Sequence, residues 1–299
     1  MKWICSIAVL LFALDGLAQN PRVNIRVDGD YRYITSNGIP NHATGQFPNA
    51  NNPNRITEQN HSWKVPVHPK QAASVTPLRL FPFGVGTNGI PFDPGAAEFW
   101  NRDFNSGWQY EPMSGTPNLG LDQNLAHVQP TGAYHYHGLP PFSMPRGEGM
   151  NQMVLAGWAA DGFPIYIQFG HADANDLLSP LKYMRSSYRM KRGARPGGDA
   201  GPGGRHSGIF VQDYEYIKGA GDLDECNGRF GKTPEFPQGT YHYFLTEAFP
   251  FIPRYFHGTP DISFQRGSPG NGPPGAGRGG PGGRRPPPGG FGGRRPPRR

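Results

Sequence analysis

The 299-residue chain has only two cysteines, so it cannot be a scaffold held together by several disulfides. It contains no serine nucleophile elbow, no Walker phosphate loop and no dinucleotide fingerprint, which are the usual sequence grounds for assigning a hydrolase, an NTPase or a Rossmann-type oxidoreductase. Long stretches with helical periodicity are scarce. Beyond the first residues no apolar run approaches the roughly 18 to 20 residues of a membrane span, and we expect no transmembrane segment in the mature chain.

The first residues have the layout of a secretory signal. Lys2 supplies a positive charge, residues 4–14 form an apolar run, and Gly16-Leu17-Ala18 offers small residues before a cleavage point. We therefore predict a signal peptide over residues 1–18, with a mature chain that begins near Gln19 and lies in the periplasm or outside the cell. Cleavage would also remove one of the two cysteines.

Positive charge is concentrated at the other end of the chain. Residues 268–299 contain seven arginines and no acid, which accounts for the whole net charge of +7. The remaining body is near neutral and lacks the general basic character that nucleic-acid binding requires. The Arg/Gly/Pro-rich tail is predicted to be disordered, because it has few apolar side chains to bury. It could bind an anionic surface or polysaccharide, or it could be a solubilising tail without a specific partner.

The body, residues 19–267, reads as one loop-rich globular domain. Short segments rich in Val, Ile, Tyr and Phe alternate with turn residues, which is typical of short strands. These segments are residues 23–27, 31–35, 63–67, 133–138, 163–169, 214–217 and 240–246. We predict a mainly β fold with two short helices, one over 94–100 capped by Asp93 and one over 175–184, and a flexible surface loop over 193–208.

One short motif occurs twice in the body. Residues 132–136 read Gly-Ala-Tyr-His-Tyr, and residues 239–243 read Gly-Thr-Tyr-His-Tyr. The repeat suggests equivalent strands of a pseudo-symmetric pair, and it leaves open an arrangement in two pseudo-symmetric lobes.

The first copy of the motif suggests a metal site. In a strand, His135 and His137 share one face about 7 Å apart and can converge on one ion. Imidazole suits Zn or Cu, among other transition metals. The second copy offers His242 as a third ligand, and His127, just upstream of the first copy, can complete the set; His42 is a further candidate. The alternative is a pair of aromatic strands whose histidines bond to loop carbonyls.

Two acidic features offer other sites. Asp222, Asp224 and Glu225 lie close together and could hold Ca²⁺, with Cys226 as a soft ligand or a buried side chain. Asp161, in a tight turn before a strand, could be a ligand or a general base. For both features the alternative is a turn whose carboxylates accept backbone hydrogen bonds.

Several long stretches resemble the YHYH-domain proteins, a family of exported proteins named for the motif at residues 134–137. They are NHATGQFPNANNPN (41–54), NGIPFDPGAAEFW (88–100), LGLDQNLAHVQPTGAYHYHG (119–138), AADGFPIY (159–166) and DLDECNGRFGKTPEFPQGTYHYFLTEAFPFIPRYFHGTPD (222–261). The resemblance implies a secreted domain and no particular activity. It covers most of the body and excludes the tail.

Two hypotheses of function follow. The chain could be a metal-dependent protein, with or without catalysis on an unknown substrate. It could instead be a non-catalytic extracellular binding or structural module, with an aromatic-rich body and a cationic tail that holds it to anionic material.

Overall fold

The structure, a computed structural model, describes residues 20–141 and 152–265. The predicted signal peptide (residues 1–18) and the predicted tail (268–299) lie outside these residues. So do residues 19, 142–151, 266 and 267 of the predicted body. The fold is mainly β, as predicted, and its helices within the described ranges are 3-10 turns of three residues each. None of those helices is long and apolar enough to span a membrane.

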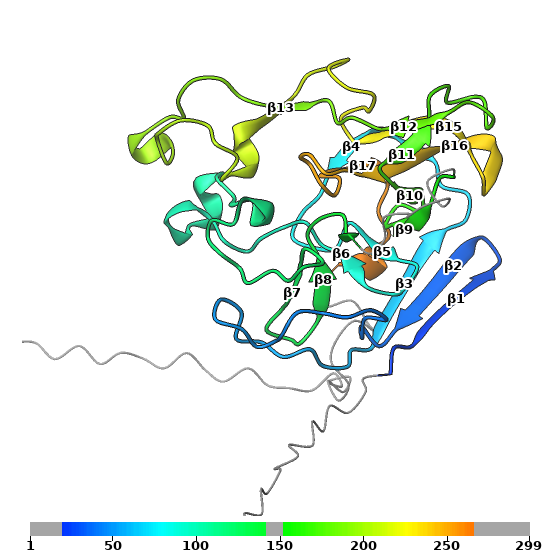
Figure 1. The fold of residues 1–299 in the computed structure, drawn as a ribbon, viewed down its shortest axis with the longest axis horizontal. Coiled ribbons are helices and arrows are strands. Elements are labelled where there is room, and N and C mark those ends of the chain that lie inside the picture. Colours follow the sequence, from blue (N-terminus) through cyan, green and yellow to red (C-terminus); the bar gives the residue numbers. More distant parts are fainter. Residues whose placement is uncertain (1–19, 142–151, 266–299) are drawn as a thin grey trace, which may run out of the picture.

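Within residues 20–141 and 152–265 the strands form two larger sheets and three two-stranded pairs (Figure 1). The three-stranded antiparallel sheet contains β1 (Val23–Asp28), β2 (Tyr31–Ser36) and β3 (His61–Pro66). The eight-stranded sheet contains β5 (Gly84–Gly86), β6 (Pro91–Phe92), β7 (Ala126–Val128), β8 (Tyr134–Tyr136), β9 (Leu155–Ala159), β10 (Pro164–Ile167), β15 (Gly228–Thr233) and β16 (Phe236–Leu245). The pairs are β4 (Gln71–Pro77) with β17 (Tyr255–Gly258), β11 (Phe169–His171) with β12 (Leu181–Tyr183), and β13 (Tyr188–Met190) with β14 (Tyr214–Tyr216).

All seven predicted strand segments contain a strand, whereas both predicted helices are wrong. Residues 94–99 are irregular, and the first 3-10 turn, η1, covers only Trp100–Arg102. Residues 175–180 form turns and residues 181–183 form β12, paired with β11. Pro180 interrupts the second segment, and its apolar residues Leu181 and Met184 pack against the core from β12 and the residue that follows it, not from a helix. Short segments of this kind become helical only when packing stabilises them.

The other 3-10 turns are η2 (Phe104–Ser106), η3 (Pro112–Ser114), η6 (Gly198–Ala200), η7 (Val211–Asp213) and η8 (Ile262–Phe264). Residues 193–208 form the predicted loop, but an ion pair anchors it to η7. The buried Arg195 guanidinium donates two hydrogen bonds of 2.6 Å to Asp213. The loop is therefore fixed at this point.

The eight-stranded sheet repeats one four-stranded unit. In the order β15-β16-β10-β9-β5-β6-β8-β7, the pairing at each end is antiparallel, the next pairing inward is parallel, and the third is antiparallel again. At the centre, β5 and β9 pair antiparallel, with Val85 opposite Trp158 and one residue paired on either side. Strands β5–β8 and strands β9, β10, β15 and β16 are thus related by a pseudo-two-fold axis through this central pair.

The turns between the first and second strands of the two units match in detail. Asn88 Oδ1 accepts a hydrogen bond from Ile90 N at 3.2 Å, and Asp161 Oδ1 accepts one from Phe163 N at 3.4 Å. The residue that follows each is a glycine with positive φ, +75° at Gly89 and +93° at position 162, a conformation that side chains rarely adopt. The predicted pseudo-symmetry is therefore present, within a single sheet.

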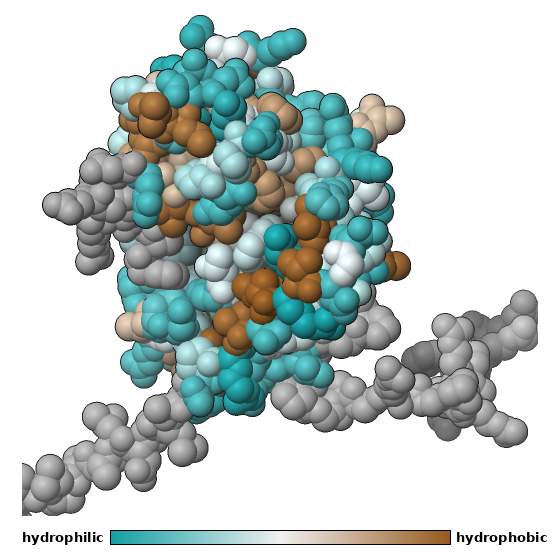
Figure 2. Space-filling model, turned by 90° about the vertical axis from the view of Figure 1, so that its right-hand side faces the viewer, coloured by the Kyte–Doolittle hydropathy of each residue, from teal (hydrophilic) through white to brown (hydrophobic). Residues whose placement is uncertain are grey.

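One cluster of buried apolar side chains joins the two larger sheets. It includes Ile34, Trp63 and Val65 from the three-stranded sheet and Val85, Ile165 and Tyr243 from the eight-stranded sheet. Exposed large apolar side chains are few and scattered, and Figure 2 shows them as separate patches and a narrow band on a mainly hydrophilic face. Scattered exposure of this kind is normal for a protein surface.

Candidate metal centre

Strand β8 presents its tyrosines and histidines to opposite faces of the sheet. Tyr134, His135 and Tyr136 form the strand, His137 follows it, and all four are at most 2% exposed. Strand β7 pairs antiparallel with β8 and places His127 directly opposite His135. Directly opposite residues in a sheet lie on the same face, so β7 adds a third imidazole to the face that carries the other two.

The three imidazoles form a nearly equilateral triangle. Their ring centroids are 4.7 Å (His127–His135), 4.6 Å (His127–His137) and 4.7 Å (His135–His137) apart, and every pair of rings is edge-on. One nitrogen from each ring lies within 4.8 Å of the others. In the described part of the chain, no other group of three or more His, Cys, Asp or Glu side chains converges closely enough to hold a metal ion.

Backbone carbonyls fix the orientation of two of the rings. His127 Nδ1 lies 2.9 Å from the Leu119 carbonyl oxygen, and His135 Nδ1 lies 3.3 Å from that of Ala133. A carbonyl can only accept, so Nδ1 carries the proton in each case and Nε2 keeps its lone pair. Ligating histidines in metalloproteins usually have this arrangement.

Burial keeps His127 in its neutral form. Desolvation lowers the pKa of His127, and the Leu119 carbonyl, Glu98 and Asp122 offset only part of that effect. A neutral imidazole is the form that binds a metal ion.

His137 is the most constrained of the three rings. Its pKa is lowered well below the usual value, first by complete burial and then by the nearby charges of His135, His127 and Arg254; the Pro94 carbonyl acts in the opposite direction. Neither ring nitrogen makes a hydrogen bond of normal geometry within residues 20–141 and 152–265. Buried polar atoms without partners are costly, so an uncharged ring with unused nitrogens at this point requires an explanation.

The opposite face of β8 carries a hydrogen-bonded network. Tyr134 OH donates to Asp122 Oδ2 at 2.7 Å. Tyr136 OH accepts from Asn88 Nδ2 at 2.9 Å and lies 2.6 Å from His42 Nε2. Of the candidates from the sequence, His42 is therefore a partner of Tyr136 on the face away from the triad.

Asp93 is a residue of the site that the sequence reasoning missed. Phe92 pairs with Tyr136 in the parallel ladder of β6 and β8, and Asp93 N donates to the Tyr136 carbonyl at 2.9 Å. Alternation places the Asp93 side chain on the face of the triad. It is 1% exposed, and its Oδ2 accepts from Gln129 Nε2 at 3.1 Å. A buried carboxylate on this face can stabilise a bound cation or orient a ligand.

The second half of the sheet contains a matching position with different residues. Strand β15 pairs with β16 as β7 pairs with β8, and Arg229 lies opposite His242 as His127 lies opposite His135. In place of His137 the second half has Phe244, since the motif there ends Tyr-His-Tyr-Phe. The Arg229 guanidinium carbon lies 5.7 Å from the centre of the Phe244 ring. A fixed cation and an apolar ring thus replace two of the three imidazoles.

The structure does not bring His242 to the triad. Strands β8 and β16 are separated by β6, β5, β9 and β10. At about 4.8 Å per strand, this corresponds to roughly 24 Å along the sheet. His242 Nδ1 lies 3.0 Å from the Thr240 carbonyl oxygen, and burial lowers its pKa to about 4. The predicted four-histidine set is therefore wrong at this one member, and His127, His135 and His137 remain.

The acidic loop has the geometry of a turn. Asp222 pairs with Lys182 at 2.7 Å and Arg185 at 3.1 Å. Asp224 Oδ1 accepts from the backbone nitrogens of Cys226 (2.9 Å) and residue 228 (3.0 Å). Together with Glu225, these carboxylates belong to no converging group among the described residues. The arrangement favours the turn alternative over a Ca²⁺ site.

Cys226 is a buried free thiol, as the simpler interpretation expected. It is 1% exposed, and its pKa is raised, mainly by burial and further by Asp224, Glu225 and Asp161. A thiol in this state is neither a good nucleophile nor a good ligand.

Asp161, the candidate general base, stabilises a turn in the second half. It accepts hydrogen bonds from Tyr243 OH, Gly258 N and Phe163 N. Burial raises its pKa to about 6 against the effect of these hydrogen bonds. Asp161 is the counterpart of Asn88, and both contact the second tyrosine hydroxyl of their motif. The role of Asp161 in the fold is therefore to stabilise this turn.

The chain matches a recognised protein family. The family described as YHYH protein matches residues 62–258, which include every strand of the eight-stranded sheet. The chain belongs to the YHYH family. Searches of curated proteins and of solved structures returned no match.

Proposed function

We propose that this chain is an exported metal-binding protein that holds one transition-metal ion, Zn²⁺ or Cu²⁺, between His127, His135 and His137. The observation that carries the proposal is the convergence of three imidazole nitrogens within 4.8 Å on one face of a two-strand ladder. Around a tetrahedral ion with metal–nitrogen bonds of 2.0–2.1 Å, such nitrogens are about 3.4 Å apart. Side-chain rotations that move the ligating nitrogens by about an ångström would bring them to this spacing.

Three protein ligands leave a coordination position for water or a substrate. Structural zinc sites normally have four protein ligands, whereas catalytic ones have three. The site as built is therefore suited to activating a bound molecule, with Asp93 as a buried carboxylate on the same face. His127 is only half-buried, so its side of the triad is the side from which solvent can reach the ion.

The ligands themselves support binding of a borderline or soft divalent ion. All three are imidazoles, which suit Zn and Cu and are poor ligands for Ca²⁺ or Mg²⁺. The neutral state that burial imposes on His127 and His137 removes the proton that would compete with the metal at neutral pH.

Metal analysis tests the proposal directly. The full chain, purified without added metal and then loaded with Zn²⁺ or Cu²⁺, is expected to retain about one ion per chain after dialysis. The variant His135→Ala with His137→Ala is expected to retain essentially none. His68→Ala is the matched control, because His68 is exposed and distant in sequence from the triad. Equal metal content in the double variant and the control would exclude the site.

Export is the second part of the proposal and has its own test. It rests on the charge, apolar run and small residues of positions 1–18. Protein recovered from the periplasm or medium should begin near Gln19. A cytoplasmic protein that keeps Met1 would contradict export and leave the metal site unaffected.

A further inference from the structure

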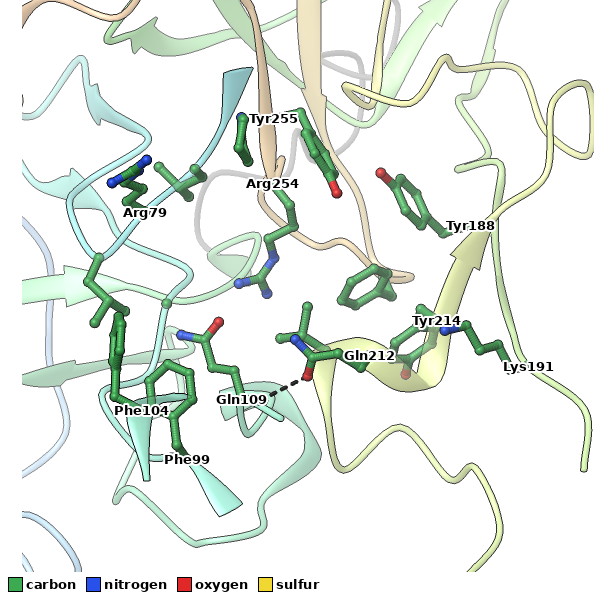
Figure 3. A pocket seen from close by; sticks show the side chains of 16 residues that line it. Arg79, Phe99, Phe104, Gln109, Tyr188, Lys191, Gln212, Tyr214, Arg254 and Tyr255 are labelled. Atoms are coloured by element: carbon green, nitrogen blue, oxygen red, sulfur yellow. Dashed lines mark hydrogen bonds between the residues drawn. The ribbon is translucent and has the colours of Figure 1, made fainter. Parts of the chain in front are cut away.

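A cavity of about 710 Å³ lies outside the metal centre, between the chain that follows β4 and the segments around η7 and β14. Its volume is in the range of small-molecule binding sites. Figure 3 shows Phe99 and Phe104 on one side of the cavity, Tyr188 and Tyr214 on the other, and the guanidinium of Arg254 between them. None of these residues belongs to the His triad.

Stacked rings form one wall of the cavity. The rings of Tyr214 and Phe249 are 3.9 Å apart and parallel within 2°. Tyr188 packs edge-on against Phe249 at 5.4 Å, and the Arg254 guanidinium lies 5.5 Å from the centre of the same ring. Interlocked rings of this kind give a rigid, flat apolar surface, and aromatic surfaces are well suited to a ligand with one apolar face.

The charges around the cavity are of one sign. Among the described residues, Arg79, Lys191 and Arg254 line it and no carboxylate does. Arg254 is neutralised by Glu111, at 2.6 Å, behind the wall. Arg79 and Lys191 make no ion pair in the part of the chain that the structure describes, and Figure 3 shows them at opposite sides of the cavity. Two separated, unneutralised cations favour an extended anion over a single compact one.

Two glutamines add directional hydrogen bonding. Gln109 uses its backbone nitrogen to bond Gln212 Oε1 at 2.8 Å, and its Nε2 donates to the Ala96 carbonyl at 2.6 Å. The Oε1 of Gln109 and the Nε2 of Gln212 are not used in these bonds. The cavity therefore offers one amide acceptor and one amide donor to a ligand with hydroxyl groups.

We propose that this cavity binds a carboxylated saccharide, a short chain of sugar rings that carries acid groups. Sugar rings have an apolar face that packs on aromatic rings and hydroxyls that bond to amides, and the acid groups match Arg79 and Lys191. The Arg/Gly/Pro-rich tail of residues 268–299 is excluded as the occupant by its charge, because cations on both sides would repel. The proposal does not depend on the metal centre.

Titration of the full chain with a uronic-acid trisaccharide tests the proposal. A chelator in the buffer keeps the metal centre empty, so the result is independent of the proposed metal binding. Saturable binding is expected, with a neutral trisaccharide at least about tenfold weaker and benzoate weaker still. Arg79→Gln and Lys191→Gln should each weaken binding about threefold, and the double variant about tenfold, as expected for charges near a protein surface.

The matched control is Arg192→Gln, next to Lys191 in sequence, exposed and not part of the cavity lining. All variants keep the cationic tail, so tail binding cancels in the comparison. Arg79 is exposed and Lys191 is partly exposed, and thermal denaturation can verify that the variants remain folded. An equal loss in the control, equal affinity for the neutral sugar, tighter binding of benzoate, or no saturable binding would each overturn the proposal.

Discussion

Replacing His137 with leucine tests whether His137 is a metal ligand or a histidine that only fills space in the core. The His137 ring is 1% exposed, and neither nitrogen makes a hydrogen bond of normal geometry among the described residues. An unsatisfied buried polar group costs about 1–3 kcal/mol, and an apolar side chain of similar size does not incur this cost. Without metal, His137→Leu should therefore be more stable than the natural protein by about 1 kcal/mol or more.

Bound metal should reverse this order of stability between the natural protein and His137→Leu. An ion at 100 times its dissociation constant stabilises the natural protein by about 2.7 kcal/mol. With two ligands left, the variant loses most of this gain, so the natural protein should become the more stable of the two. Urea unfolding of both proteins, in chelator and in excess Zn²⁺, measures both differences, and His68→Leu controls for loss of an exposed histidine.

A change of sign between the two conditions is the specific expectation. If His137→Leu were less stable than the natural protein in chelator, and zinc changed neither protein, then His137 would be a packing residue. The claim that an ion explains its burial would then be wrong.

Three further predictions concern the second half of the sheet. Burial lowers the pKa of His242 to about 4, so its neutral state contributes stability above pH 6.5 that is lost as the pH falls toward 4, by about 3 kcal/mol in total. Asp161, with a raised pKa of about 6, titrates in the opposite sense in both proteins. The measurement is therefore the free energy of unfolding of the natural protein in urea minus that of His242→Leu, which should fall by about 3 kcal/mol as the pH drops across this window. Arg229→His with Phe244→His should raise bound zinc from about one to about two ions per chain by equilibrium dialysis, if the two halves are equivalent; an unchanged stoichiometry would show that they differ beyond these two positions. Cys226 should react with a thiol reagent only after unfolding, because it is buried with a raised pKa, and rapid labelling of the folded protein would contradict that state.

Local patterns in the sequence predicted seven of the seventeen strands that the described residues form, and all three histidines of the triad. His135 and His137 share a face because of strand alternation alone, and a turn between residues 128 and 134 was enough to return His127 beside them. The choice of His242 failed for a different reason. Which strands lie side by side is decided by long-range pairing, and β16 pairs with β15 and β10 rather than with β8.

A second repeat in the sequence would have corrected this choice. Asn-Gly-Ile-Pro at residues 88–91 and Asp-Gly-Phe-Pro at 161–164 follow the first strand of each unit, and the Tyr-His-Tyr motifs lie in the last. Two repeats in the same order indicate two copies of one unit, each with its own motif strand. The first of these repeats runs into strand β6, which pairs with β8, and Asp93 directly follows β6. The two helix predictions failed because helices this short form only when packing stabilises them, and packing is not decided by local sequence.

The position of the triad at the end of the sheet has a mechanical consequence. Strand β7 is the outermost strand at one end, and β15 is the outermost at the other. Edge strands are the parts of a sheet that detach first and that pair with foreign chains. An ion held by His127 and His135 would cross-link β7 to β8, whereas Arg229 over Phe244 joins β15 to β16 permanently. Loss of the metal would therefore loosen the β7 edge and leave the β15 edge intact. The first detectable effect should be self-association through β7 rather than global unfolding.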